Sequence, residues 1–241
     1  MPDILKVEII RTEALDAAGI ALWREWTATN PTLTSPYFRW DYAEIAGRVC
    51  PGAALAVFRR DGRLVGFFPF QRRGRAVQPL GAPMNDYHGV IAPAEETISL
   101  EEVARLLKAS RLSVPGWIGA GEAGCARQTV QVVMPDSGYD AWYAERRATY
   151  GKYFKDKERA RRSLEAELGP IRVERALRDP DMLDRLIELK AAQYRRSGLH
   201  DIFACGWMRD LLHALMNDPR EDFAGSMAAM AFVLVVARRV P

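Results

Sequence analysis

An aspartate and a histidine two residues apart, in Asp86-Tyr87-His88, are the first candidates for chemistry in this chain. They lie in a glycine- and proline-rich loop over residues 78–89. Polar side chains on such loops are often placed for recognition or catalysis. At this spacing a carboxylate and an imidazole could share a proton, or hold an acceptor hydroxyl or amine. The alternative is that Asp86 forms a turn and His88 is a surface residue.

A second pair of candidates lies on a predicted helix. Asp179-Pro180 is typical of a helix start, because aspartate caps free N–H groups and proline fits the first helical position. Gly198 favours a left-handed stop. Lys190 and Tyr194 are one turn apart and therefore share a face. They could contact an anionic substrate, or the lysine stem and tyrosine ring could cover the core.

Basic residues are concentrated in one segment. The chain carries a net charge of +3, and the excess of basic over acidic residues in 141–168 equals that whole charge. The segment could bind a polyanion, although Tyr150, Tyr153 and Phe154 are expected to pack inward rather than to stack on bases. Its interleaved acidic residues, with Glu158 and Arg162 four apart, also fit a solvated, self-paired helix face.

Metal binding and disulfides are not expected. Cys50, Cys125 and Cys205 are far apart and form no C-x-x-C pair, so neither a zinc site nor a disulfide framework is indicated. His88, His200 and His213 suggest no ligand set. His200-Asp201 follows Gly198 and is better read as an aspartate cap than as a catalytic pair.

The chain has no segment that predicts a membrane span. Its longest apolar run, residues 227–237, is eleven residues long, whereas a span needs about 20. The N-terminus lacks the apolar core of a signal peptide. We therefore expect a soluble protein in the cytoplasm.

Secondary structure can be predicted for most of the chain. Asp61-Gly62 between two apolar runs predicts a β-hairpin, and Ser99 with Glu102 forms a capping box before a helix. Asn30-Pro31 should end the first helix. The remaining expectations are strands at 4–10, 117–120, 129–134 and 171–174 and helices at 12–28, 152–168 and 207–216.

Several of these segments together resemble the CelD-like acyltransferases, a branch of the GNAT superfamily related to the FemAB aminoacyl transferases and linked by name to cellulose biosynthesis. The resemblance covers roughly residues 20 to 226. The residues that carry it are Ser35-Pro36-Tyr37-Phe38, Gly81 to Gly89, the Lys155–Arg162 run, Ile187-Glu188-Leu189-Lys190 with Gln193-Tyr194, and Gly198 with Asp201-Ile202-Phe203.

The resemblance implies an α/β (α+β) fold with a GNAT-like mixed sheet flanked by helices. Residues 1–138 would form a nearly complete N-terminal domain, and residues 139–241 the first part of a second, truncated domain. Residues 227–237 then predict an apolar strand with no partner strand after it, which would leave an open edge. Gln71 to Ala76 fits the GNAT pyrophosphate pattern, but residues 77–81 cannot continue as a helix, so a basic turn is the better reading.

The implied activity is acyl transfer from acetyl-CoA or another acyl-CoA to an amine or hydroxyl of a saccharide or cell-envelope precursor, impaired in this chain. Asp86 and His88 would be the catalytic residues, and Tyr87, Lys190 and Tyr194 would contact substrate. Acyl-CoA is a co-substrate, and no bound cofactor, metal or nucleic-acid partner is expected. The alternative function is a non-catalytic polyanion-binding or protein-interaction module.

Overall fold

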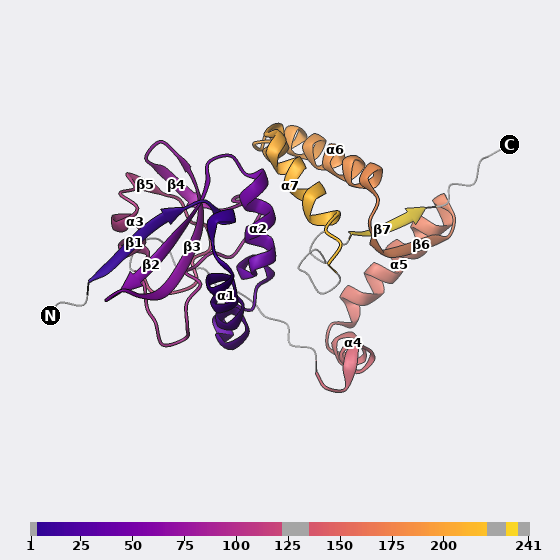
Figure 1. Cartoon of the computed structure of the whole chain (residues 1–241). Helices are drawn as coiled ribbons and strands as arrows, with labels where there is room; N and C mark the ends of the chain where they lie inside the picture. The colour runs from indigo at the N-terminus through magenta and orange to yellow at the C-terminus, as the bar shows by residue number, and fades with distance from the viewer. Residues whose placement is uncertain (1–3, 122–134, 221–229, 236–241) are drawn as a thin grey trace. The chain divides into compact units, whose positions relative to one another are not determined.

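The computed structural model describes residues 4–121, 135–220 and 230–235 (Figure 1). The fold is α+β, as predicted. Two compact units form, one containing the described residues 4–121 and 178–220, and the other residues 135–177 and 230–235. The domain boundary at residue 138 remains a prediction.

A five-stranded sheet is the centre of the first unit. Its strands lie in the order β1–β2–β3–β4–β5. Their bounds are Leu5–Ile10, Ala53–Arg60, Arg63–Arg73, Ala76–Pro79 and Arg111–Leu112. Neighbouring strands are antiparallel except β4 and β5, which are parallel, so the expected mixed sheet is confirmed.

The β2–β3 hairpin turns at Asp61 and Gly62, as predicted. Their φ angles are 49° and 81°, and a type I′ turn needs positive φ at both central positions. The next hairpin, β3–β4, turns at Gly74 with φ 60°. Strand β4 follows directly, so Gln71 to Ala76 is a basic strand end and turn rather than a helix start, which confirms that reading.

Two helices, α1 (Ala17–Thr29) and α2 (Trp40–Val49), cover one face of the sheet (Figure 1). Helix α1 begins later than predicted because Asp16 caps it, accepting from Gly19 N at 2.8 Å. Asn30 ends it, as expected. Trp23 stacks on Phe67 of β3 at 5.1 Å between ring centroids. Helix α2 was not predicted.

Three 3-10 turns precede or separate the two helices, namely η1 (Thr12–Ala14), η2 (Pro31–Leu33) and η3 (Pro36–Phe38).

The opposite face of the sheet packs against α3 (Leu100–Leu106). Ser99 and Glu102 form the predicted capping box, with Glu102 N donating to Ser99 Oγ at 3.2 Å. Val103 and Leu107 join a buried cluster with three phenylalanines of β2 and β3, which are Phe58, Phe68 and Phe70. The strand expected at 117–120 is only a single bridge between Trp117 and His88. The strand expected at 129–134 lies outside the described residues.

The first unit also contains α6 (Pro180–Arg196), η4 (Ile202–Ala204) and α7 (Gly206–Met216). Asp179 caps α6 by accepting from Asp181 N at 3.0 Å, and Asp201 accepts from Phe203 N at 3.0 Å. Both aspartate caps were predicted. Gly198 has φ 66°, which confirms the left-handed stop.

The second unit contains α4 (Gly138–Thr149), α5 (Gly151–Leu168), β6 (Ile171–Leu177) and β7 (Met230–Val235). The basic segment 141–168 is two helices, not one, because the chain leaves helical geometry at Tyr150 (φ −115°, ψ 42°). The apolar segment 227–237 was predicted to be a strand with no partner strand after it. Its described part, β7, pairs antiparallel with β6, which precedes it, so this part of the segment is not an unpaired strand.

Two further expectations for the basic segment need correction. Glu158 pairs with Arg147 of α4 at 2.8 Å rather than with Arg162, because α4 and α5 lie side by side at this point. Tyr150 and Tyr153 were expected to pack inward, but they are 55% and 59% exposed.

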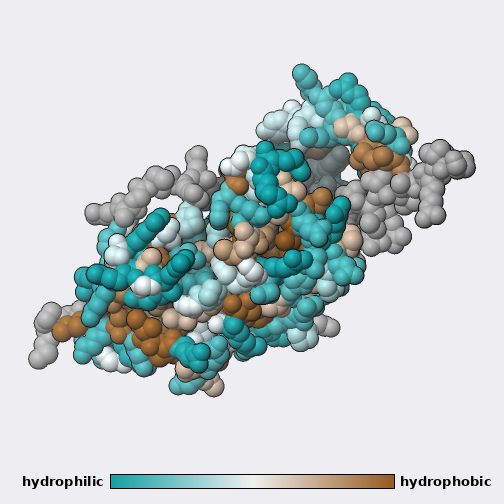
Figure 2. Space-filling view, turned by 90° about the horizontal axis from the view of Figure 1, so that it is seen from above, coloured by the Kyte–Doolittle hydropathy of each residue, from teal (hydrophilic) through white to brown (hydrophobic). Residues whose placement is uncertain are grey.

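Hydrophilic residues predominate on the face shown in Figure 2, with hydrophobic residues interspersed among them. Isolated exposed apolar side chains are ordinary on protein surfaces. Among the described residues, no helix is both long and apolar enough to cross a membrane.

Candidate functional site

The loop that carries Asp86, Tyr87 and His88 places these three side chains in different environments. Asp86 is exposed, Tyr87 is half-buried, and His88 is only 3% exposed. The His88 backbone forms a bridge, since its N donates to Gly116 O at 2.8 Å and its carbonyl accepts from Ile118 N at 2.6 Å. The alternative that His88 is a surface residue is therefore wrong.

The His88 ring forms a local hydrogen bond with the backbone of Asn85. Its Nε2 atom is buried and has no partner among the described residues. No hydrogen bond joins His88 to Asp86 in the described structure, so the predicted pair does not share a proton in this state. The two side chains therefore provide separate groups. His88 has a buried nitrogen that can accept a hydrogen bond, and Asp86 has an exposed carboxylate.

Tyr42, Asn85 and His88 line one small cavity, and each has a buried polar atom without a described partner, namely Oη, Oδ1 and Nε2. The cavity measures about 10 Å³, and a buried water needs roughly 10–15 Å³ and two to four polar partners. Tyr37 and Tyr87 also line it. At this size the cavity can hold at most a single water, which both donates and accepts hydrogen bonds.

Burial sets the protonation state of the titratable side chains in and near this cavity. Burial lowers the pKa of His88 to about 4, although the Asn85 backbone hydrogen bond opposes that shift. At pH 7 the imidazole is therefore neutral. Burial also raises the pKa of Tyr42, and raises the pKa of Cys50 to about 12. Neither is ionised at neutral pH, so both can only donate or accept hydrogen bonds there.

Tyr37 connects the cavity to the exposed carboxylate. Burial and the charge of Asp86, in that order, raise the pKa of Tyr37. Its hydroxyl lies 3.5 Å from the Met84 carbonyl, in the same loop as Asp86. The structure therefore places Asp86 close enough to Tyr37 for their charges to interact, beside the cavity that contains His88.

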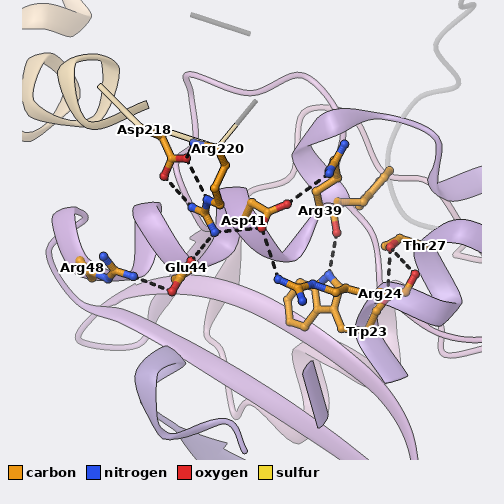
Figure 3. Close-up of polar contacts among 10 residues, drawn as sticks. Trp23, Arg24, Thr27, Arg39, Asp41, Glu44, Arg48, Asp218 and Arg220 are labelled. Atoms are coloured by element: carbon orange, nitrogen blue, oxygen red, sulfur yellow. Dashed lines mark hydrogen bonds and ion pairs between the residues drawn. The ribbon is translucent and has the colours of Figure 1, made fainter. Parts of the chain in front are cut away.

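Tyr42 belongs to α2, and a charged network holds that helix (Figure 3). Asp41, 7% exposed, accepts from Arg220 Nη1 at 2.9 Å and lies 3.3 Å from Arg39 Nη2. Glu44 accepts from the same Arg220 nitrogen at 2.8 Å. Arg220 is itself held by Asp218. The network fixes the position of α2 and hence of the Tyr42 hydroxyl.

Lys190 and Tyr194 share a face of α6, as predicted. The lysine nitrogen lies 5.4 Å from the tyrosine ring centroid and donates to Gln193 at 3.1 Å. The Tyr194 ring lies 6.4 Å from that of Phe203. No described contact joins this pair to residues 86–88, so the structure does not bring the two sets of predicted site residues into contact.

Sequence reasoning missed Tyr42 and Asn85. Asn85 is adjacent to Asp86, and its buried side-chain amide donates to Leu80 O at 2.9 Å. A search for asparagine side chains that hydrogen-bond to the backbone of their own loop could therefore have found it. Tyr42 carries no sequence signal, because only the packing of α2 brings its hydroxyl against Gly81. Among the described residues, no cluster of three histidine, cysteine or acidic side chains could hold a metal.

Residues 151–232 match the family model of the Acetyltransferase (GNAT) domain. This match covers about a third of the chain and supports placing the protein in the GNAT superfamily. It supports acyl transfer as the class of activity and is consistent with acyl-CoA as co-substrate. Comparisons with curated proteins and with solved structures gave no match.

Proposed function

We propose that this protein is a GNAT-type N- or O-acyltransferase, of the CelD-like, FemAB-related kind. It would move an acyl group from acyl-CoA to an amine or hydroxyl of a saccharide or cell-envelope precursor. The GNAT match of residues 151–232 is the observation that carries the proposal. The sequence resemblance supports the saccharide acceptor.

In the proposed reaction the acceptor nitrogen or oxygen attacks the thioester carbonyl. A new C–N or C–O bond forms, the C–S bond breaks, and coenzyme A leaves as the thiolate. The acceptor proton passes to a base on the enzyme. Asp86 is exposed and can approach a bound acceptor, whereas neutral His88 offers Nε2 as a hydrogen-bond acceptor.

The Asp86 carboxylate is exposed, whereas the Nε2 atom of His88 is buried beside a cavity of about 10 Å³. We therefore assign proton removal to Asp86, and we assign to His88 an indirect role, orientation of the acceptor through one water in that cavity. Tyr87, Lys190 and Tyr194 are proposed to contact substrate. Half-buried Tyr87 lines the His88 cavity, and Lys190 provides a positive charge for an anionic group.

The test is acylation of a panel of amino sugars and neutral saccharides with acetyl-CoA, followed by mass spectrometry. We expect an acylated saccharide in amounts that depend on the enzyme. Asp86→Asn should lower the rate by about 10²-fold or more, the usual effect of losing a general base. Asp61→Asn, an exposed turn aspartate outside the loop, is the matched control. Absence of any acylated saccharide, or equal rates for the two variants, would refute the assignment.

One observation favours the second candidate function, polyanion binding. Lys152, Lys155, Arg159 and Arg162 line a groove of about 550 Å³ along α5, together with Asp156. Asp156 pairs with Arg159 at 2.9 Å, which reduces the net charge of the groove. Binding to heparin that weakens steeply with salt, and weakens further in Lys155→Gln, would support this function. Salt-independent or absent binding would exclude it.

A further inference from the structure

Strand β1 is an edge of the five-stranded sheet. It pairs with β2 along its whole length, from Leu5 opposite Arg60 to Ile10 opposite Leu55, and no other strand of the described residues pairs with it. One row of its backbone N–H and C=O groups is therefore open to another strand. An open edge of this kind can be extended by a strand from a second molecule.

The two faces of β1 differ in polarity. Leu5 belongs to the buried cluster below the sheet, and Val7 packs against that cluster. Because side chains alternate along a strand, Ile9 lies on the same face, where it is 49% exposed. Lys6 and Glu8 lie on the other face, and both are exposed. Neither of these two charged side chains makes an ion pair within the described part of the chain.

One register of a second β1 strand fits these side chains. In an antiparallel pair centred on Val7, Lys6 lies opposite Glu8 of the second copy, and Ile9 lies opposite Leu5 of the second copy. Opposite charges and apolar side chains that face each other across two strands both stabilise the pair. Moving the centre to Lys6 or to Glu8 would place like charges opposite each other. A shift that pairs odd with even positions would set the polar face of one strand beside the apolar face of the other.

The neighbouring strand supports the same register. Lys6 lies directly opposite Arg59 of β2, and like charges in that position repel each other. In the paired sheet, Glu8 of the second copy lies on the other side of Lys6 and offsets this repulsion. Charges that only protect an edge from pairing can have a single sign. Strand β1 instead carries one charge of each sign two residues apart, which is self-complementary in an antiparallel pair.

We infer that β1 is a docking edge for a second copy of this chain. The two β1 strands pair antiparallel about Val7, so that two sheets join edge to edge into one continuous sheet. The dimer contains the pair between Lys6 and Glu8 twice and covers the exposed Ile9 of each chain. Because the contact is one strand wide, and small interfaces associate weakly, the dimer is reversible. This inference is independent of the proposed acyl transfer.

Sedimentation velocity of the intact chain tests the inference over about a hundredfold range of concentration, since a weak dimer forms only at the upper end. We expect the wild type to change from monomer to dimer. Lys6→Glu and Glu8→Lys each place like charges opposite each other twice in the dimer. Each variant should therefore raise the dimer dissociation constant by about tenfold or more. An equimolar mixture of the two variants should dimerise again, because each chain then carries the charges that complement the other.

The matched control is Glu25→Lys, which makes the same change of charge at an exposed position of α1. It should leave the dimer dissociation constant within about twofold of the wild-type value, since the position lies outside the strand pair. The inference is overturned if the wild type remains a monomer at every concentration. It is also overturned if Glu8→Lys dimerises as the wild type does, or if the mixture of the two β1 variants remains monomeric.

Disulfide cross-linking measures the register itself and does not depend on the charge variants. In a chain with Cys125→Ser and Cys205→Ser, Val7→Cys should cross-link two chains under mild oxidation, because the two positions lie opposite each other at about 5 Å between Cβ atoms. Ile9→Cys is the control. Position 9 is more exposed than position 7, but its two copies lie four residues apart along the paired strands, at roughly 14 Å. Equal cross-linking of the two variants, or none in Val7→Cys, would contradict pairing about Val7.

Discussion

Arg220 donates to Asp41 at 2.9 Å across 179 residues of sequence. The contact joins the segment after α7 to α2, within the first unit. Asp41 is nearly buried, and it also lies 3.3 Å from Arg39 and 3.6 Å from Arg24. Arg220 further contacts Glu44 and Asp218 (Figure 3). The carboxylate of Asp41 is therefore the central anion of the network.

Asp41→Asn should destabilise the protein by about 1–3 kcal/mol. Removing one member of a buried charge network leaves the remaining charges poorly compensated, and the exposure of the arginines reduces the cost. Urea denaturation followed by circular dichroism measures the effect. The control is Arg48→Gln, which breaks an exposed i,i+4 pair with Glu44 and should cost under about 0.5 kcal/mol. Equal costs for the two variants would contradict a central role for Asp41.

Stability should fall as the pH is lowered from 6.5 to about 4. The folded-state pKa of His88 lies at about 4, below its ordinary 6.5, so in this window the unfolded chain binds more protons than the folded one. The stabilisation is therefore complete above pH 6.5 and is lost as the pH falls, by about 3 kcal/mol in all.

Denaturation curves of the wild type and of His88→Gln across pH 4–7 measure this contribution. The variant should lose that part of the pH dependence. His200→Gln, which changes an exposed histidine, should retain it. An unchanged slope in His88→Gln would show that His88 titrates normally in the folded protein.

Gly81→Ala should destabilise the protein by about 2 kcal/mol or more. Gly81 has φ 84°, which an alanine adopts only at a cost of roughly 1 kcal/mol, and an added Cβ would collide with the Tyr42 hydroxyl oxygen. Tyr42→Phe removes that oxygen, so the double variant should recover part of the loss. The coupling is read from a double-mutant cycle of unfolding free energies. Additive effects would mean that Tyr42 and Gly81 are not in contact.

Ser99→Ala should cost about 1 kcal/mol, the usual effect of losing an N-terminal cap. Ser99 accepts from Glu102 N, and Glu102 returns a hydrogen bond to Ser99 N at 2.9 Å. Ser137 precedes α4 but makes no side-chain cap, so Ser137→Ala should change stability by less than about 0.5 kcal/mol. Thermal melts of both variants provide the comparison, and similar shifts would argue against the capping box.

Local structure could be predicted from the sequence wherever the deciding interactions lie within a few residues. The Asp61-Gly62 hairpin, the Ser99 capping box and the aspartate caps at Asp179 and Asp201 were all expected. Each depends on a side chain that bonds to a backbone group two or three positions away, or on a residue that tolerates positive φ. The break between α4 and α5 was missed because it depends on the geometry at Tyr150, which the surrounding charges do not reveal.

The sequence alone determined the locally specified caps and hairpin, the α+β class and the loop that carries Asp86 and His88. Tertiary structure decided how those residues are used. Burial made His88 a neutral acceptor and grouped it with Tyr42 and Asn85. Packing after α7 brought Arg220 to Asp41. These outcomes depend on contacts between segments far apart in the chain. The free energy of such contacts comes from burial and desolvation in the folded state, which cannot be predicted from a local sequence pattern.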